Sequence, residues 1–218
     1  MSDWLTWQVV DSAFPTGTFA HSWGLESAWQ HGEVDGAPAL RAFLDASIQQ
    51  AGYAALPLVN AAFDAPDELE AFDEIADAFL INAVANRASR VQGRTLAATA
   101  ARVWSVPALE AIELRVQDGC AHAAPVSGAV FRVLGLTRSS TQRVVLFATA
   151  RGVLSAAVRL GIVGSYEAQR MQQACAPWLD RVASDCAQLT VSDLAQTAPL
   201  VDILQAGHDR LYSRLFQS

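Results

Sequence analysis

A long apolar segment between residues 141 and 160 constrains the fold of this chain most. Its apolar residues fall on nearly all sides of a helix, and a helix of this kind is usually central and buried. The most apolar window, residues 144–164, contains Arg151 and Arg159, so it lacks the roughly 18 uncharged apolar residues of a membrane span. We therefore expect a buried central helix, capped within residues 139–141, and no membrane span.

Most other segments also show helical periodicity, as at positions 40, 43, 44, 47 and 48. No segment alternates with period two between turns. The pattern predicts an all-α, single-domain bundle over residues 1–218, with about ten helices around the central one. Three further expectations concern where helices begin and end. One helix should end at Gly52, and another should span residues 166–185. The apolar stripe that begins at Leu69 should either continue to Trp104 or break near Gly93.

The composition points to partner proteins and excludes several enzyme classes. Hydrophobic residues make up 52% and charged residues 17%, which predicts apolar surface reserved for partners and a homodimer with an apolar interface. A net charge of −7 argues against nucleic acid as a partner. All fifteen basic residues are arginine, so P-loop nucleotide hydrolysis and Schiff-base chemistry, which need lysine, are excluded.

The N-terminal residues and the cysteines are both those expected of a cytoplasmic protein. Residues 1–4 show no basic region or cleavage pattern, so we expect no signal peptide. Cys120, Cys175 and Cys186 are an odd number without framework spacing, which predicts reduced thiols and a cytoplasmic protein.

No strong catalytic or metal-ligating motif is present. The four histidines form no His-Glu-x-x-His, and the spacing of Cys120 and His122 is weak evidence of a metal site. His21 with Asp11 and Ser12 could form a nucleophile set, but Gly-x-Ser-x-Gly is absent, and a histidine hydrogen-bonded to a nearby loop is favoured. Carboxylates such as those of Asp73 and Asp77 lie in an acidic run, residues 64–77, which we expect to be solvated. Two alternatives stay open: an all-α binding module for a small apolar ligand, and a hydrolase built on His21.

The stretch from residue 11 to residue 26 has a distinctive local pattern. Pro15 and Gly17 predict a sharp connection over residues 14–18, because proline disfavours a helix before it and glycine permits a positive φ. After the connection, residues 19–29 follow helical spacing with Gly24 inside. An interior glycine costs roughly 1 kcal/mol relative to alanine, so it predicts the close approach of another backbone.

This stretch resembles the N-terminal signature of the UreF family of urease accessory proteins. Arg-Val-Gln-Gly at 90–93, Ala-Ala-Val-Arg-Leu-Gly at 156–161 and the segment 208–218 resemble later blocks of that family, in the same order. The matching residues are Pro15, Gly17, His21, Ser22, Gly24, Leu25, Glu26, Gly93, Gly128, Arg159, Gly164, His208, Tyr212, Ser213, Arg214, Leu215, Phe216 and Ser218. The chain departs where the family commonly carries a Glu-x-Arg pair, because Val84 and Asn86 stand there.

The resemblance implies a function without catalysis. It implies an all-α homodimer that joins a UreD-type protein (called UreH in some species), recruits and regulates the GTPase UreG, and assists nickel insertion into apo-urease. No cofactor or metal is expected on this chain, since the complex handles the nickel. Within family-like blocks, Glu26 and Arg159 are expected on partner surfaces; the alternative is an internal Glu–Arg pair.

The segment 208–218 is the expected recruiting element. Leu211 and Leu215 lie four residues apart, as do Tyr212 and Phe216, so a helix here would carry one apolar stripe. An eleven-residue helix is marginal alone, which predicts a poorly ordered or loosely docked tail in the free protein. Against the UreD-type partner it would become helical, with Tyr212, Leu215 and Phe216 as anchors and Arg214 meeting an acidic group. The alternative is a stripe packed on its own bundle.

Overall fold

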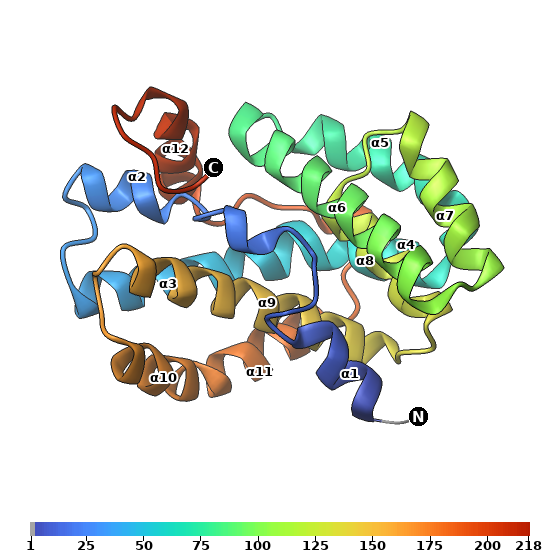
Figure 1. The fold of residues 1–218 in the computed structure, drawn as a ribbon, viewed down its shortest axis with the longest axis horizontal. Coiled ribbons are helices and arrows are strands. Elements are labelled where there is room, and N and C mark those ends of the chain that lie inside the picture. The colour runs from blue at the N-terminus through green and yellow to red at the C-terminus, as the bar shows by residue number, and fades with distance from the viewer. Residues whose placement is uncertain (1–2) are drawn as a thin grey trace.

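A computed structural model describes residues 3–218, and its regular structure is helical throughout these residues (Figure 1). Met1 and Ser2, and with them part of the expectation about a signal peptide, lie outside the described residues. The α-helices are α1 (Asp3–Val10), α2 (Leu25–Gln30), α3 (Ala37–Gln50), α4 (Leu56–Asp64), α5 (Leu69–Phe79), α6 (Ala83–Trp104), α7 (Pro107–Asp118), α8 (Ala123–Val133), α9 (Arg138–Arg159), α10 (Ser165–Ala174), α11 (Ala176–Asp185) and α12 (Pro199–Ala206). The shorter elements are the 3₁₀ turns η1 (Thr18–Ala20), η3 (Pro66–Glu68), η4 (Val191–Asp193) and η5 (Gly207–Arg210) and the π turn η2 (Ala51–Ala55). The predicted all-α class is confirmed.

The helix α9 is the centre of the molecule, as its all-round apolar pattern predicts. It contacts α1, α2, α3, α4, α8, α10 and α11, and it runs lengthwise through the fold (Figure 1). Its side chains enter both apolar clusters of the core, Val144 one of them and Val153 the other. The predicted cap within residues 139–141 is wrong: the cap is Thr137, whose hydroxyl accepts a hydrogen bond from the Ser140 amide at 3.1 Å. Among residues 3–218, no helix combines the length and apolar character that a membrane crossing requires.

Three predicted helix boundaries are wrong. The helix that contains Leu40 does not end at Gly52, because a π turn carries the chain from α3 into α4. The stripe that begins at Leu69 breaks at residues 80–82 rather than near Gly93, because the Asn82 side chain accepts from the amides of the first turn of α6. Residues 166–185 form two helices that meet at Cys175, with a proline in the first turn of the second.

Two signature glycines lie where backbones come into contact. A Cβ atom on Gly128 of α8 would lie 2.4 Å from the Val59 carbonyl oxygen of α4, and one on Gly93 of α6 would lie 1.9 Å from the Ala121 carbonyl oxygen. The backbones at both positions therefore lie closer together than any side chain would permit: α8 against α4, and α6 against the loop that holds Ala121. Gly164 has open space around it and directly precedes α10, so it lies at a break between helices and makes no close contact.

The contact between α4 and α8 predicts a large effect of one methyl group. Gly128→Ala should lower the free energy of unfolding by about 3 kcal/mol or more, because the backbone of α4 cannot move aside without disturbing the core. Denaturant unfolding measures the change. The matched control is Gly164→Ala, which should be neutral or slightly stabilising because its φ is −79° and nothing lies within 4 Å. Equal stability of the Gly128→Ala variant and the unmodified protein would contradict this packing.

Candidate functional site

The signature segment connects α1 to α2 through an irregular path. The predicted connection over residues 14–18 is confirmed, with Gly17 at φ 74°. The helix after it is shorter than expected: α2 begins at Leu25, so Gly24 precedes the helix, with φ 86°. The predicted close approach at Gly24 is confirmed, because a Cβ atom there would lie 3.0 Å from Cβ and 3.2 Å from Cα of Gln205 in α12.

Glu26, in the first turn of α2, is buried beneath the C-terminal tail, which we define as residues 208–218. One carboxylate oxygen accepts hydrogen bonds from His208 Nε2 at 3.0 Å and the Phe216 amide at 3.1 Å. The other accepts from the Leu215 amide at 2.6 Å. Three donors of the tail therefore converge on a carboxylate that is 2% exposed. Burial without such donors would be costly for a charged group.

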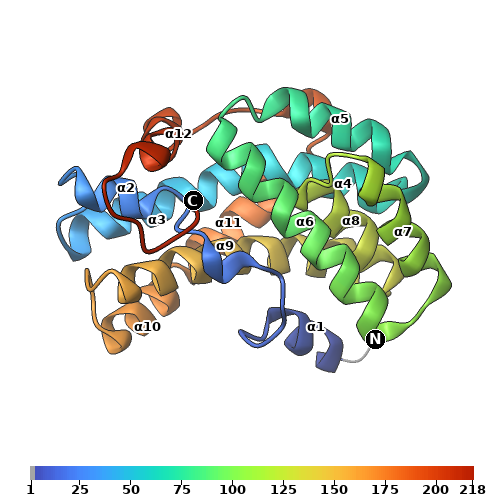
Figure 2. The same cartoon turned by 45° about the horizontal axis from the view of Figure 1, so that its top comes forward.

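The last residue of the chain closes a second contact with the signature. The main-chain oxygen of Ser218 accepts from the Ser22 amide at 2.5 Å and from the Ser22 hydroxyl at 3.0 Å. The Ser218 hydroxyl lies 2.5 Å from Nδ1 of His21, and the Gln217 amide donates to the Ala20 carbonyl at 2.8 Å. Figure 2 shows the tail running from α12 back across α2 to the connection between α1 and α2.

Arg159 of α9 fixes the tail from the third side. Its guanidinium carbon lies 4.1 Å from the ring centroids of both Phe19 and Phe216, and Nη1 donates to the Phe19 carbonyl at 2.6 Å. Cation–π contacts of this kind hold both rings in place. Arg159 therefore links α9, η1 and the tail of its own chain.

Several expectations for these residues are wrong. Glu26 is not on the surface, and its ionic partner is His208, so the internal pair with Arg159 is not formed either. The tail is not loosely docked, because Phe216 is buried against its own bundle. After η5 it continues without helix, and the expectation that it becomes helical against the partner stays a prediction. The cause of this docking is the set of polar contacts that Glu26 and His21 make with the tail backbone and with Ser218, which an apolar periodicity does not reveal.

Part of the tail remains on the surface. The side chain of Tyr212 is fully exposed and that of Leu215 is 54% exposed. Arg214 lies 3.5 Å from Asp209, which also pairs with Arg87 of α6 at 2.8 Å. Ser213 accepts a hydrogen bond through its carbonyl from Gln30 of α2 at 2.9 Å. The tail thus presents a surface loop on a fixed base.

The predicted nucleophile set around His21 is not assembled. The Asp11 carboxylate accepts from the Ala13 amide, and the contact of His21 is to Ser218 rather than to Ser12. The pKa of His21 is lowered from 6.5 to about 4, chiefly by burial and to a smaller extent by the nearby His208 and Arg87. Within residues 3–218, Nε2 of His21 has no hydrogen-bond partner. The imidazole is therefore a neutral, buried part of the tail contact.

A partly open cavity bears on the apolar-ligand alternative. Its volume is about 270 Å³, and alanine and leucine side chains from η2, α4, α5, α6, α8 and α9 contribute much of its wall. His21 of the signature and His122 both line it. The cavity has the apolar character of a small-ligand pocket but few converging polar groups.

The pairing of His208 with Glu26 is not predicted by the sequence analysis. One signal was available: Glu26 lies one position after Leu25 and one before Ser27, all inside a segment otherwise free of charge from residue 12 to residue 32. A lone carboxylate in such surroundings indicates burial with donors, and the remaining histidine of the family-like blocks is one such donor.

The buried His21 predicts a pH dependence of stability. Its pKa in the folded chain, about 4, lies below the unfolded value of 6.5, so the unfolded state binds the extra proton first. The contribution of neutral His21 to the free energy of unfolding is therefore complete above pH 6.5 and is lost as the pH falls toward 4. At about 1.4 kcal/mol for each tenfold change in proton affinity, the loss is about 3 kcal/mol.

The variant His21→Asn should flatten this part of the profile, because its amide can bond to Ser218 but does not titrate. Urea unfolding at intervals between pH 4 and pH 7 gives the free energy of unfolding of the variant and of the unmodified protein. The difference between the two removes the contribution of the carboxylates, which both proteins share. His31→Asn, at an exposed histidine, is the control and should keep the original profile. A His21→Asn profile parallel to that of the unmodified protein would contradict the assignment.

Comparison with known proteins gives the family. The model of the UreF family matches residues 34–176. The chain is 39% identical over 221 residues to urease accessory protein F of Arabidopsis thaliana, covering 99% of this chain and 92% of the relative. It is 36% identical over 219 residues to urease accessory protein F of Oryza sativa subsp. japonica, covering 98% and 84%, and 30% identical over 219 residues to urease accessory protein UreF of Trichodesmium erythraeum (strain IMS101), covering 96% and 94%. The chain belongs to the UreF family.

Proposed function

We propose that this protein assists the maturation of urease as a scaffold without catalytic activity of its own. Membership of the UreF family supports a role in urease maturation. The observation that carries the proposal is the tail, which buries His208, Phe216 and Ser218 and leaves Tyr212 and Leu215 on the surface. The tail is the recruiting element, and its buried half serves as the base for its exposed half.

The exposed half has the composition of a binding surface. Tyrosine and arginine are enriched among the residues that dominate binding energies, and an apolar neighbour such as Leu215 adds area. Gln30 and Asp209 hold the loop through Ser213 and Arg214, so the partner would not have to order it. A prearranged loop lowers the entropic cost of association. Phe216 is removed from the set of anchors, because its ring already packs on Arg159.

The proposed partner at this loop is a UreD-type accessory protein. The assembly would then recruit the GTPase UreG, regulate its hydrolysis of GTP, and deliver nickel to apo-urease, the ion being handled by the complex. We also propose a homodimer, because Leu200 and Ile203 of α12 and the nearby Ile81 expose apolar side chains. Asn82 connects these two segments through its hydrogen bonds to Asp202.

The second candidate is an all-α module that binds a small apolar ligand, and the 270 Å³ cavity favours it. This function would need no partner at the tail. Variants of exposed tail residues therefore separate the two candidates.

We expect the double variant Tyr212→Ser, Leu215→Ser to lose binding to a co-expressed UreD-type protein. Loss of two anchor side chains should cost about 2 kcal/mol or more, roughly thirtyfold in affinity. Both side chains are exposed, so the melting temperature should change little. Affinity capture followed by titration calorimetry measures the effect.

The matched control is Tyr166→Ser, which removes an 87% exposed tyrosine from α10. It should bind the partner as the unmodified protein does. Undiminished binding by the double variant would refute the tail as recruiting element. Light scattering of the same samples tests the homodimer, and a strict monomer at tens of micromolar would argue against it.

A further inference from the structure

The loop between α7 and α8 is held in a strained conformation by two other helices. Asp73 of α5, itself buried, accepts hydrogen bonds from the amides of Ala121 at 2.7 Å and His122 at 2.6 Å. Ala121 has φ 64°, a conformation that is costly for a residue with a side chain. Its carbonyl lies against Gly93 of α6, where no Cβ atom would fit. Strain that the surroundings maintain in this way is frequent at functional sites.

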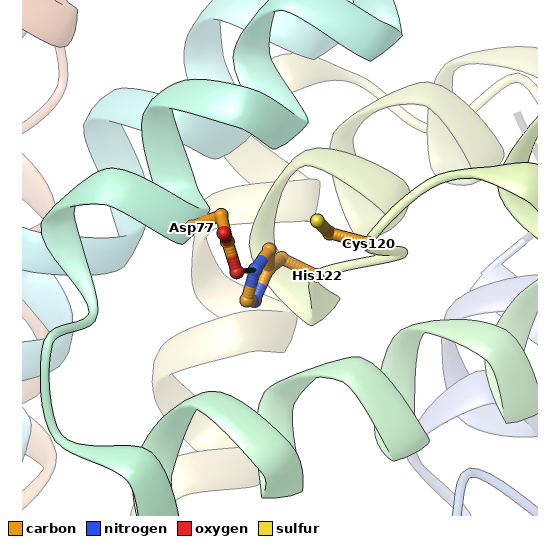
Figure 3. A group of neighbouring side chains, drawn as sticks. All are labelled: Asp77, Cys120 and His122. Atoms are coloured by element: carbon orange, nitrogen blue, oxygen red, sulfur yellow. Dashed lines mark hydrogen bonds and ion pairs between the residues drawn. The ribbon is translucent and has the colours of Figure 1, made fainter.

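The strained loop brings three metal-ligating side chains together. Asp77 of α5 and Cys120 and His122 of the loop point toward one another (Figure 3). One ligand atom of each lies within 4.8 Å of the others, and Nε2 of His122 lies 3.1 Å from Oδ1 of Asp77. His122 is completely buried, while Asp77 and Cys120 are partly exposed. The group therefore has a fixed inner donor and an open outer side.

The hydrogen bond at Nδ1 of His122 leaves Nε2 free to coordinate a metal ion. Nδ1 lies 3.2 Å from the Ser89 hydroxyl oxygen, which also accepts from the Ala123 amide at 3.1 Å. When Nδ1–H donates to this oxygen, the lone pair of Nε2 faces Asp77 and Cys120. Histidines that bind metals are usually oriented by a hydrogen bond at the other ring nitrogen.

The charges of the group fit a divalent cation. Within the group, Asp77 contacts Nε2 of His122 and the thiol of Cys120, and outside it Asp77 accepts a hydrogen bond from the side-chain amide of Asn86. The nearby Arg90 is directed to the Cys120 carbonyl at 3.2 Å rather than to Asp77. A thiolate and a carboxylate would together neutralise a doubly charged ion.

We propose that Asp77, Cys120 and His122 form a binding site for one divalent transition-metal ion of borderline softness, such as Zn²⁺, Co²⁺ or Ni²⁺. A sulfur, nitrogen and oxygen donor set suits these ions and not Mg²⁺ or Ca²⁺. Ligand atoms around a tetrahedral ion are roughly 3.5 Å apart. The His122–Asp77 pair, at 3.1 Å, is already near this spacing, and all three ligand atoms lie within 4.8 Å of one another, so binding would need only small adjustments. The Cys120 thiol would release its proton to solvent, and water would complete the coordination on the open side.

Metal titration of the reduced, full-length protein tests the site. Chelator-treated protein is titrated with Co²⁺ or Ni²⁺ and followed by near-ultraviolet absorbance, where thiolate coordination gives a charge-transfer band. Equilibrium dialysis with Zn²⁺ gives the stoichiometry. We expect one ion per chain, a charge-transfer band, and no competition by millimolar Mg²⁺.

Two pairs of variants locate the ion. Cys120→Ser should abolish the band, whereas Cys175→Ser, at a thiol buried in the core, should leave it unchanged. Asp77→Asn should weaken binding about tenfold or more, whereas Glu74→Gln, at an exposed acid one turn earlier in α5, should not. Circular dichroism confirms that each variant is folded.

The absence of a band in the unmodified protein, or a band that survives in Cys120→Ser, would overturn the proposal. Equal weakening by Asp77→Asn and Glu74→Gln would do the same, because it would indicate general attraction by the acidic helix. The site does not depend on the proposed scaffold function. Failure of the metal titration would leave partner binding by the tail untouched.

Discussion

The burial of the Glu26 carboxylate is the interaction on which the N- and C-terminal parts of this structure depend. A carboxylate inside a protein is stable only with hydrogen-bond donors, and removing one member of a buried ionic pair commonly costs 3–5 kcal/mol. Here all the donors to Glu26 come from residues 208–216. The tail is therefore required by the interior of the domain and cannot leave without exposing a buried charge.

This requirement explains how the tail can serve recognition. Chain ends normally fray, and an end that folds only on binding lowers the affinity by the cost of ordering it. Glu26, His21 and Arg159 order the tail within its own chain, so Tyr212 and Leu215 are presented on a fixed loop. In the proposed function, the signature residues would act on a partner indirectly, by positioning the residues that touch it.

Much of the fold could be predicted from the sequence, because helix positions follow from apolar periodicity. The central helix α9 and the turn at Gly17 were recognisable for this reason. The failures share a different cause, which is a polar contact between distant segments. The break before α6 depends on the side chain of Asn82, and the docked, non-helical tail depends on Glu26, 189 residues before Leu215. Periodicity carries no information about such pairs.

Asp73 shows that some contacts between distant segments can be recognised in the sequence. It lies four residues after Leu69 and three before Ala76, both buried, so it belongs to the apolar face of α5 and not to a solvated run. That position indicates a buried carboxylate with a specific task, here the loop that holds Cys120 and His122. The Cys120–His122 spacing became informative only when the fold added Asp77 from another helix.

Amide hydrogen exchange by NMR tests the central claim, that the tail is part of the folded domain, most directly. In the free protein, the amides of Leu215, Phe216 and Gln217 donate to Glu26 and Ala20, so they should exchange far more slowly than an unstructured peptide. Glu26→Gln should release this protection, whereas Glu33→Gln, at an exposed position of the following loop, should not. Exchange of these three amides at the unstructured rate in the unmodified protein would contradict the account.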